Sequence, residues 1–175
     1  MAEVAAEKLL VELAEIVRSR FFGKYRGLVQ DVEDPENLGR VTAQVPEIYG
    51  EQDSPWALPA VPFAGNGHGL VLLPEVGDGV WLEFEAGDPS RPIWTGCWWG
   101  TGEIPDPGGT KTRVLVTPSG HKFVLDDEGD KLQLLHSGGA ELTMTSNDIT
   151  LKIGSTQIVL SSAGVSINNG AFEVR

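Results

Sequence analysis

The sequence predicts a mainly β protein with an N-terminal helix, a small closed barrel and then a ladder of short strands. Three observations support this fold class. Apolar residues near the start have helical spacing, short strands punctuated by Gly, Pro and Asp fill residues 25–99, and apolar and polar residues alternate after residue 113. The chain has 175 residues, of which 41% are hydrophobic. This is enough for one core of ordinary size and an extension.

The charge balance is acidic and argues against some classes of partner. The chain has 25 Asp and Glu residues against 13 Lys and Arg, which gives a formal net charge of −12. Nucleic acid and anionic membrane surfaces attract Lys and Arg, so we expect neither as a partner. No stretch approaches the roughly 20 apolar residues of a membrane span, and no signal-peptide pattern begins the chain. Export is therefore expected by lysis or as part of a larger particle.

Residues 1–24 are expected to contain an amphipathic helix that runs from residue 2 to about residue 20. The apolar residues of this region fall on one stripe. The stripe consists of Leu9, Leu10, Leu13, Ile16 and Val17. It is expected to dock either on the domain that follows or on another protein.

Residues 25–99 are expected to form a barrel, because closure removes the exposed edges of short strands. The candidate strands are 25–32, 40–45, 69–73, 79–84 and 92–98. Turn residues between the later strands are Gly77-Asp78-Gly79 and Gly87-Asp88-Pro89.

Residues 100–113 are rich in Gly, Pro and Thr and are expected to be a linker, and residues 114–175 are expected to form the ladder. One face of the ladder is predicted to be apolar. Its residues are Leu132, Leu134, Leu142, Met144, Ile149, Leu151, Ile153, Ile158, Leu160, Val165, Ile167, Phe172 and Val174. Rungs this short cannot enclose a core alone, so three chains are expected to supply one wall each of a triangular prism. Asp at Leu151 or Ile158 should then abolish assembly, while Lys152→Asp should be nearly neutral.

Two segments of the barrel carry a resemblance to a known family. Residues 34–41 read Asp-Pro-Glu-Asn-Leu-Gly-Arg-Val, and residues 74–96 contain a strand, a Gly-Asp-Pro turn and an Arg-Pro-Ile strand. Both resemble the barrel of phage baseplate assembly protein V and of VgrG, the type VI secretion spike. Residues 119–122 (Ser-Gly-His-Lys) and the ladder extend the match. The resemblance implies an OB-fold collar followed by an intertwined trimeric β-helix.

The same resemblance implies a function. The chain is expected to be the central spike of a contractile injection system, a structural homotrimer and not an enzyme, which joins a tube hub to a tip and pierces the target envelope. It is expected to assemble in the cytoplasm into a phage tail or tail-like particle. VgrG proteins carry hub domains ahead of the barrel, whereas a helix precedes it here. A separate hub protein is therefore expected to contact Leu10, Leu13 and Val17.

The tip is expected to bind no metal, and no cofactor is expected elsewhere. Some spikes of this family end in a His-x-His motif that ligates an axial iron. Here His68, His121 and His136 lie outside the final rungs, and none is two residues from another. A separate tip protein of the PAAR type is expected to cap a blunt end made by Ile167, Phe172 and Val174.

Other candidate chemistry has a plainer interpretation in each case. Cys97 would need a base such as His68 to act as a nucleophile, and a small buried apolar residue is the expected role. Residues 65–69 (Gly-Asn-Gly-His-Gly) are expected to be a flexible loop rather than a nucleotide site. Residues 126–130 are expected to be a solvated turn rather than a calcium site. The five Trp residues leave a carbohydrate-binding barrel on a trimeric stalk as the alternative function.

Overall fold

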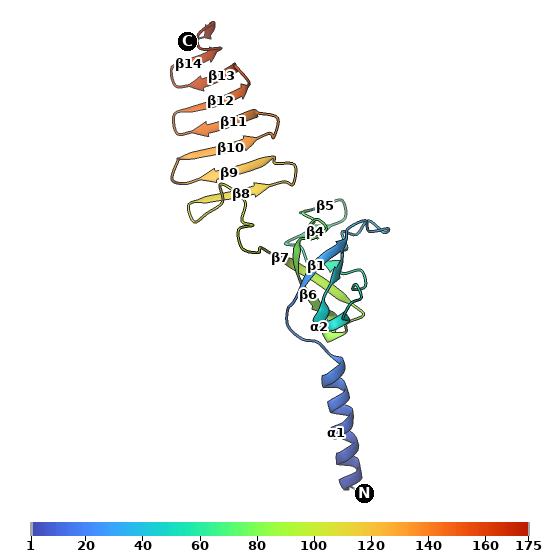
Figure 1. The fold of residues 1–175 in the computed structure, drawn as a ribbon. Helices are drawn as coiled ribbons and strands as arrows, with labels where there is room; N and C mark the ends of the chain where they lie inside the picture. The colour runs from blue at the N-terminus through green and yellow to red at the C-terminus, as the bar shows by residue number, and fades with distance from the viewer. Residues whose placement is uncertain (1, 175) are drawn as a thin grey trace. The chain divides into compact units, whose positions relative to one another are not determined.

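The computed structural model describes residues 2–174, and the side chains of residues 7–172. The chain forms two compact units, Met1–Gly102 and Glu103–Arg175. The first holds the helix and a barrel sheet, and the second is a ladder of strands (Figure 1). The prediction of a mainly β protein with an N-terminal helix is confirmed. Within residues 2–174, no helix combines the length and apolar character that crossing a bilayer requires.

The N-terminal helix α1 spans Ala2–Ser19 and is anchored to the barrel through the residues that follow it. Arg20 forms an ion pair with Asp88 at 3.4 Å, and the Phe21 amide donates a hydrogen bond of 2.8 Å to the Gly87 carbonyl. The Phe21 ring meets the Tyr25 ring edge-on, with centroids 6.1 Å apart. The end of the helix is therefore fixed by contacts outside its own apolar stripe.

Five strands make up the barrel sheet, in the order β2-β1-β6-β7-β3. They are β1 (Tyr25–Asp31), β2 (Thr42–Gln44), β3 (Leu58–Pro59), β6 (Gly79–Phe84) and β7 (Pro92–Trp98). A short helix α2 (Pro46–Tyr49), a 3₁₀ turn (Glu85–Gly87) and a small hairpin of β4 (Ala64–Gly65) and β5 (His68–Gly69) complete the unit.

The barrel core is small and strongly apolar. Its buried residues are Val29, Val41, Ala43, Val45, Ala57, Val80, Leu82 and Trp94. Strand β6 shows how the sequence builds it, because Val80, Leu82 and Phe84 are buried while the residues between them are not. Gly79 lies directly under the Trp98 ring, where a Cβ atom would be only 2.5 Å from the ring. That position therefore needs glycine.

The prediction of a strand at residues 69–73 is wrong beyond its first residue. Residues 70–73 belong to no strand, and β5 ends at Gly69. The fifth place in the sheet is taken by Leu58–Pro59, which pairs parallel with Ile93 and Trp94 of β7. A strand forms where a neighbouring strand edge has free hydrogen-bonding groups. The edge of β7 pairs with β3 and is therefore not available to residues 70–73.

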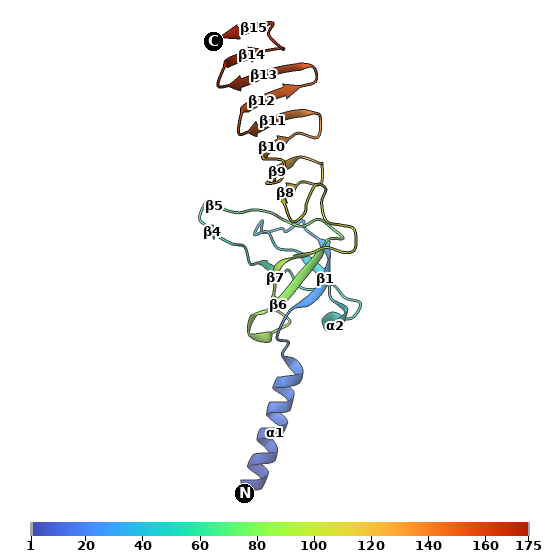
Figure 2. The same cartoon turned by 90° about the vertical axis from the view of Figure 1, so that its left-hand side faces the viewer.

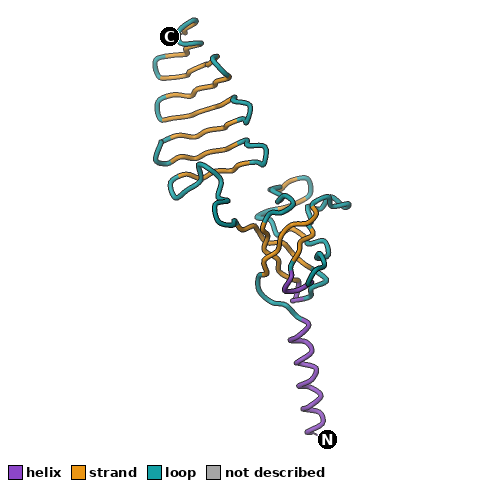
Figure 3. Tube along the Cα trace, in the orientation of Figure 1, coloured by secondary structure: helices purple, strands orange, loops and turns teal. Residues whose placement is uncertain are grey.

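Eight strands form the second unit, and each pairs antiparallel with the next along the chain. They are β8 (Thr112–Val116), β9 (Lys122–Asp126), β10 (Lys131–Leu135), β11 (Ala140–Thr145), β12 (Asp148–Ile153), β13 (Thr156–Ser161), β14 (Gly164–Ile167) and β15 (Phe172–Val174). Figure 2 shows the rungs up to β15, and Figure 3 shows the loops that join them at alternating edges of the sheet.

Candidate assembly surfaces

A column of apolar side chains runs through all eight strands of the ladder. Residues that pair directly across antiparallel strands point to the same side of the sheet. The register connects one apolar residue from each strand in turn. The column is Leu115, Phe123, Leu134, Leu142, Leu151, Ile158, Ile167 and Phe172. We call this side of the sheet the apolar face.

A second column lies two residues away on the same face. It contains Leu125, Leu132, Met144, Ile149, Leu160 and Val165. Ile153 extends the face at its other edge and is 70% exposed. Every predicted core residue whose side chain is described therefore lies on the apolar face. Val174 pairs with Val165 through its backbone, and its side chain lies outside the described residues.

The apolar face is uncovered in the single chain. Leu134 and Leu151 are exposed by 52% and 44%, and an open hollow of about 710 Å³ lies over the middle of the face. Large contiguous apolar surfaces on soluble proteins mark sites of association.

The opposite face of the ladder carries polar partners. Lys152 forms an ion pair with Glu141 at 3.5 Å, and the Gln133 side-chain amide donates to the Thr143 hydroxyl at 3.1 Å. Both contacts join neighbouring strands, so this face is stabilised without an added partner. One face of the sheet is thus apolar and uncovered, whereas the other carries polar pairs between its own strands.

The sequence interpretation missed the first two rungs of the apolar face. Leu115, Phe123 and Leu125 lie on it, although only later rungs were expected to contribute. Alternation alone is ambiguous there, because Val114 and Val124 place apolar side chains on the opposite face. The acidic turn at residues 126–130 joins β9 to β10. A hairpin drawn around this turn pairs Phe123 with Leu134 and would have placed the first rungs on the apolar face.

Two histidines that are far apart in the sequence meet at one edge of the ladder. The rings of His121 and His136 lie 4.4 Å apart. Each Nδ1 accepts a backbone N–H, from Ser137 at 3.2 Å and from Gly138 at 2.9 Å respectively. Nδ1 is thereby occupied as an acceptor, which leaves the hydrogen of a neutral ring on Nε2.

The predicted hub contact on α1 is exposed. Leu10, Leu13 and Val17 are exposed by 66%, 49% and 73%. Leu9 and Ile16 of the same stripe are also exposed. The stripe is therefore left uncovered by the described part of this chain.

The predicted tip contact lies on the last strands. Ile167 pairs with Phe172 between β14 and β15, and Phe172 is largely exposed. The third predicted residue, Val174, has only its backbone described. Among the described strands β15 pairs only with β14, so this rung offers an apolar side chain and a strand edge that no described strand covers.

Cys97 is exposed, so the expectation of a buried cysteine is wrong. The pairing along β7 shifts between Trp94 and Cys97, which face Leu82 and Val80, and such a bulge bends the strand. Cys97 follows this bulge at the end of β7. Desolvation, followed by the charge of Asp78, raises the pKa of its thiol. A raised pKa keeps the sulfur protonated, which is the reverse of an activated nucleophile.

The two loops with candidate ligand chemistry have well-defined turns. Residues 65–69, expected to be a flexible loop, contain a hairpin in which Gly65 pairs with His68 around Gly67 at φ 76°. In the acidic turn, Asp126 accepts the Gly129 amide at 2.9 Å and faces Lys131 at 3.7 Å. Among the described side chains, no group of three or more His, Cys, Asp or Glu gathers as metal ligands would.

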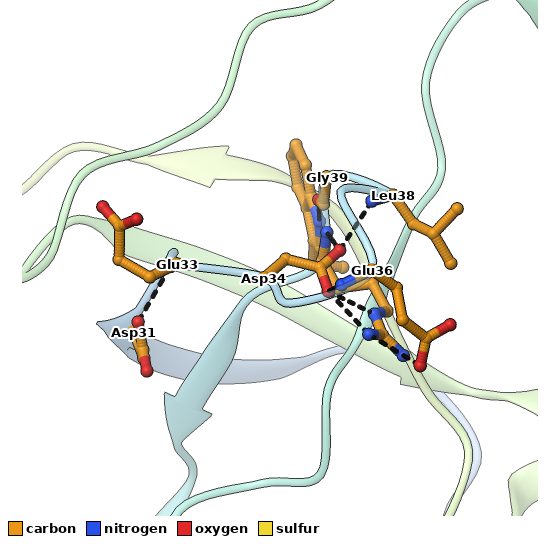
Figure 4. A network of polar contacts seen from close by, with 8 residues as sticks. Asp31, Glu33, Asp34, Glu36, Leu38 and Gly39 are labelled. Atoms are coloured by element: carbon orange, nitrogen blue, oxygen red, sulfur yellow. Dashed lines mark hydrogen bonds and ion pairs between the residues drawn. The ribbon is translucent and has the colours of Figure 1, made fainter.

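A buried ion pair shapes the loop between β1 and β2 (Figure 4). The side chain of Asp34 is only 4% exposed and accepts two hydrogen bonds from the Arg40 guanidinium, at 2.6 and 2.9 Å. It also accepts the backbone amides of Glu36, Leu38 and Arg40. The Arg40 side chain, followed by these amides, holds the pKa of Asp34 well below its usual range.

Three tryptophans of the barrel have their rings covered by other groups. The Arg26 guanidinium lies 5.4 Å from the Trp81 ring and 5.3 Å from the Trp98 ring. Trp94 is buried, and its indole donates to the Gly39 carbonyl at 3.1 Å. Arg26 thus covers part of the Trp81 and Trp98 rings, whereas Trp99 at the end of the barrel domain is 64% exposed.

Two family models match this chain. Residues 25–99 match the type VI secretion system/phage-baseplate injector OB domain. Residues 112–173 match the phage baseplate V C-terminal trimerisation domain. The first match covers the barrel sheet, and the second covers the ladder from β8 to β15.

Two curated relatives are spike proteins of type VI secretion systems. VgrG4b of Pseudomonas aeruginosa is 40% identical over 47 residues, which are 27% of this chain. VgrG3 of Vibrio cholerae is 37% identical over 65 residues, which are 35% of this chain. Each match covers 6% of the relative's own length.

Proposed function

This chain belongs to the phage baseplate V family, whose OB domain and trimerisation domain it carries, and we propose that it is the central spike of a contractile injection system. In this role it is a structural homotrimer and not an enzyme. Contraction of an outer sheath drives a tube forward, and the spike at its front pierces the target envelope.

The observation that carries the proposal is the uncovered apolar face of the ladder. Leu115 and Phe172 stand at the two ends of its central column. Three ladders that turn this face inward would bury it together, as the three walls of a prism. Burial of apolar area is the main favourable contribution to protein association. Because each strand pairs with the next strand of its own chain, each wall of the prism would come from one chain, and the chains would not be intertwined strand by strand as the resemblance implied.

Stiffness follows from the same arrangement. Separating the three walls would expose all of their apolar faces to water at once. Opening even one rung would therefore cost free energy. The outer faces would carry the polar pairs described above. A trimer of chains that each carry a net charge of −12 would also repel other trimers and anionic envelopes. Such a needle could pass an envelope without unfolding.

Two protein partners would complete the spike. The exposed stripe of Leu10, Leu13 and Val17 supports a contact with a separate tube hub protein. The exposed Phe172 and the strand edge at β15 support a cap by a small tip protein of the PAAR type. Assembly would take place in the cytoplasm, before the chain becomes part of a phage tail or a related particle.

The experiment that tests the proposal is a native mass measurement joined to labelling of purified particles. The purified chain should have the mass of three copies at micromolar concentration. A gold label on the chain should sit at the baseplate end of contractile particles. A stable monomer, or a label along the sheath, would contradict the proposal.

The tip is expected to be free of metal. Elemental analysis of the purified trimer should find less than about 0.1 iron or zinc per trimer after chelation. About one ion per trimer that survives chelation would contradict this. Removing residues 170–175 should weaken binding of the tip protein, and unchanged binding would place the cap elsewhere.

A further inference from the structure

The segment 69–73 (Gly-Leu-Val-Leu-Leu) has the composition of a strand, but only Gly69 lies in one, where it pairs with Ala64. Leu70 donates one backbone hydrogen bond, to the Phe63 carbonyl at 3.2 Å. Within residues 2–174, the backbones of Val71, Leu72 and Leu73 make no hydrogen bond. An extended segment with free N–H and C=O groups is a template for pairing with another chain.

The side chains of this segment are apolar and open to solvent. Val71 is 77% exposed, and Leu70, Leu72, Leu73 and Phe63 are also exposed. No Asp, Glu, Lys or Arg occurs between residues 60 and 74. The surface therefore offers nothing to a charged ligand and suits an apolar protein surface.

The segment is held to its own barrel at one end. Leu73 packs over Gly39, where a Cβ atom would lie 3.2 Å from the leucine Cδ2. Gly39 belongs to the loop that the buried Asp34–Arg40 ion pair fixes. At the other end, β4 and β5 form a separate two-stranded sheet, which projects to the left of the barrel strands in Figure 2. The contact between Leu73 and Gly39 therefore holds one end of the segment on its own barrel.

In the proposed trimer, a second copy of this chain is the partner that the linker keeps near this surface. Residues 99–111 join β7 to β8 and can span at most about 45 Å. If the ladders form a trimer, three barrels are held within tens of ångströms of one another. Such tethering gives effective concentrations on the order of millimolar, at which even a weak apolar contact forms.

We propose that residues 69–73 dock as an extended strand on the barrel of a neighbouring copy. The inference rests on the trimer proposed above. It adds a second interface, in the OB domain, to the one in the trimerisation domain. It also explains why residues 71–73, which have strand composition, pair with no strand within residues 2–174.

The test is site-specific crosslinking in the full-length chain. A photo-reactive amino acid replaces Val71 in one variant and Gln30, an exposed polar residue of β1, in the control. Irradiation of the Val71 variant should yield chain-to-chain products at least fivefold above the control, with attachment sites within residues 25–99 of another copy. Amide exchange in the unmodified chain should be slowed at least a hundredfold at residues 71–73.

The outcomes separate this inference from the proposed function. A trimer with crosslinking no greater than the control, or with residues 71–73 exchanging at unprotected rates, would overturn the inference and leave the spike assignment standing. Crosslinks that run only to a hub protein would also overturn it. A monomeric chain would overturn both.

Discussion

Replacing Leu151 with Asp should prevent the trimer from forming. Leu151 lies in the central column of the apolar face, between Leu142 and Ile158, and is 44% exposed in the single chain. Full burial of a leucine side chain is worth about 2–3 kcal/mol, so burying the remainder contributes about 1 kcal/mol per copy. Three copies therefore lose about 3 kcal/mol of apolar burial alone.

The carboxylate of the introduced Asp weakens the trimer further. Each ion buried without a partner costs several kcal/mol, and the trimer would bury three of them on one level. The total penalty is on the order of 10 kcal/mol or more, which corresponds to roughly a 10⁷-fold weaker association. A trimer with that loss should not persist at micromolar concentration.

The matched control is the neighbouring residue on the opposite face. Lys152→Gln removes the surface ion pair with Glu141, which is worth about 0–1 kcal/mol. Gln is preferred to Asp, because Lys152 pairs directly across the strands with Glu141. An Asp there would put like charges opposite each other, at a cost of about 0.2–1 kcal/mol per pair.

The outcome would be measured by native mass spectrometry and light scattering at about 10 µM. This concentration is far above the nanomolar dissociation constant of a tight complex. We expect a trimer for Lys152→Gln and a monomer or aggregate for Leu151→Asp. Circular dichroism would report whether the barrel in the variant stays folded. A Leu151→Asp trimer of unchanged melting temperature, or equal damage from both substitutions, would refute the assignment of faces.

Three further predictions concern the helix and the barrel. Deleting residues 1–20 should leave a soluble trimer that binds the hub protein at least tenfold more weakly by interferometry, and an unfolded product would show instead that the helix packs on its own barrel. Asp34→Asn should flatten the pH dependence of the melting temperature below about pH 4, because the lowered pKa of Asp34 beside Arg40 stabilises the fold above that pH and the stabilisation is lost as pH falls; an unchanged slope would contradict this. Tyr49 donates a hydrogen bond of 2.6 Å to the Pro89 carbonyl, and burial raises its pKa to about 12. Tyr49→Phe should cost about 1 kcal/mol at neutral pH and reduce the loss of stability as pH rises above about 10, whereas an equal alkaline transition would rule out Tyr49 as its source.

The parts of the fold that were predictable depend on local pairing. Strands β6 and β7 were expected at residues 79–84 and 92–98, and both have these bounds. They follow one another, both are rich in apolar and aromatic residues, and turn residues lie between them. The information that fixes them therefore lies within about twenty residues of sequence.

The parts that were missed depend on distant partners. Leu58–Pro59 is a two-residue strand with a proline, which the sequence gives no reason to prefer, and it forms because β7 offers a parallel edge. Residues 70–73 show the opposite case, since strand composition without a partner strand gave no strand. Cys97 was misplaced because alternation ignores the bulge in β7. His121 and His136 meet only because adjacent rungs bring them together.

The candidate assembly surfaces follow the same division. The apolar face of the later rungs could be predicted from alternation alone. Apolar and polar residues alternate within each of these rungs, and alternate residues of a strand point to the same face of the sheet. Whether these faces line a trimer core, and whether Leu10, Leu13 and Val17 contact a hub, depends on other chains. Those assignments remain predictions until the assembly is measured.

The antiparallel stacking of the ladder has a consequence for how needles of this kind can change in length. Each rung adds about 4.8 Å, and the chain reverses direction at every turn. Inserting or deleting a hairpin, such as β11 with β12, would change the length by about 10 Å while preserving the direction of the chain and the identity of both faces. A one-residue insertion within a rung would instead turn its apolar side chains outward. The length of the ladder can therefore vary in steps of two rungs without changing which face is apolar.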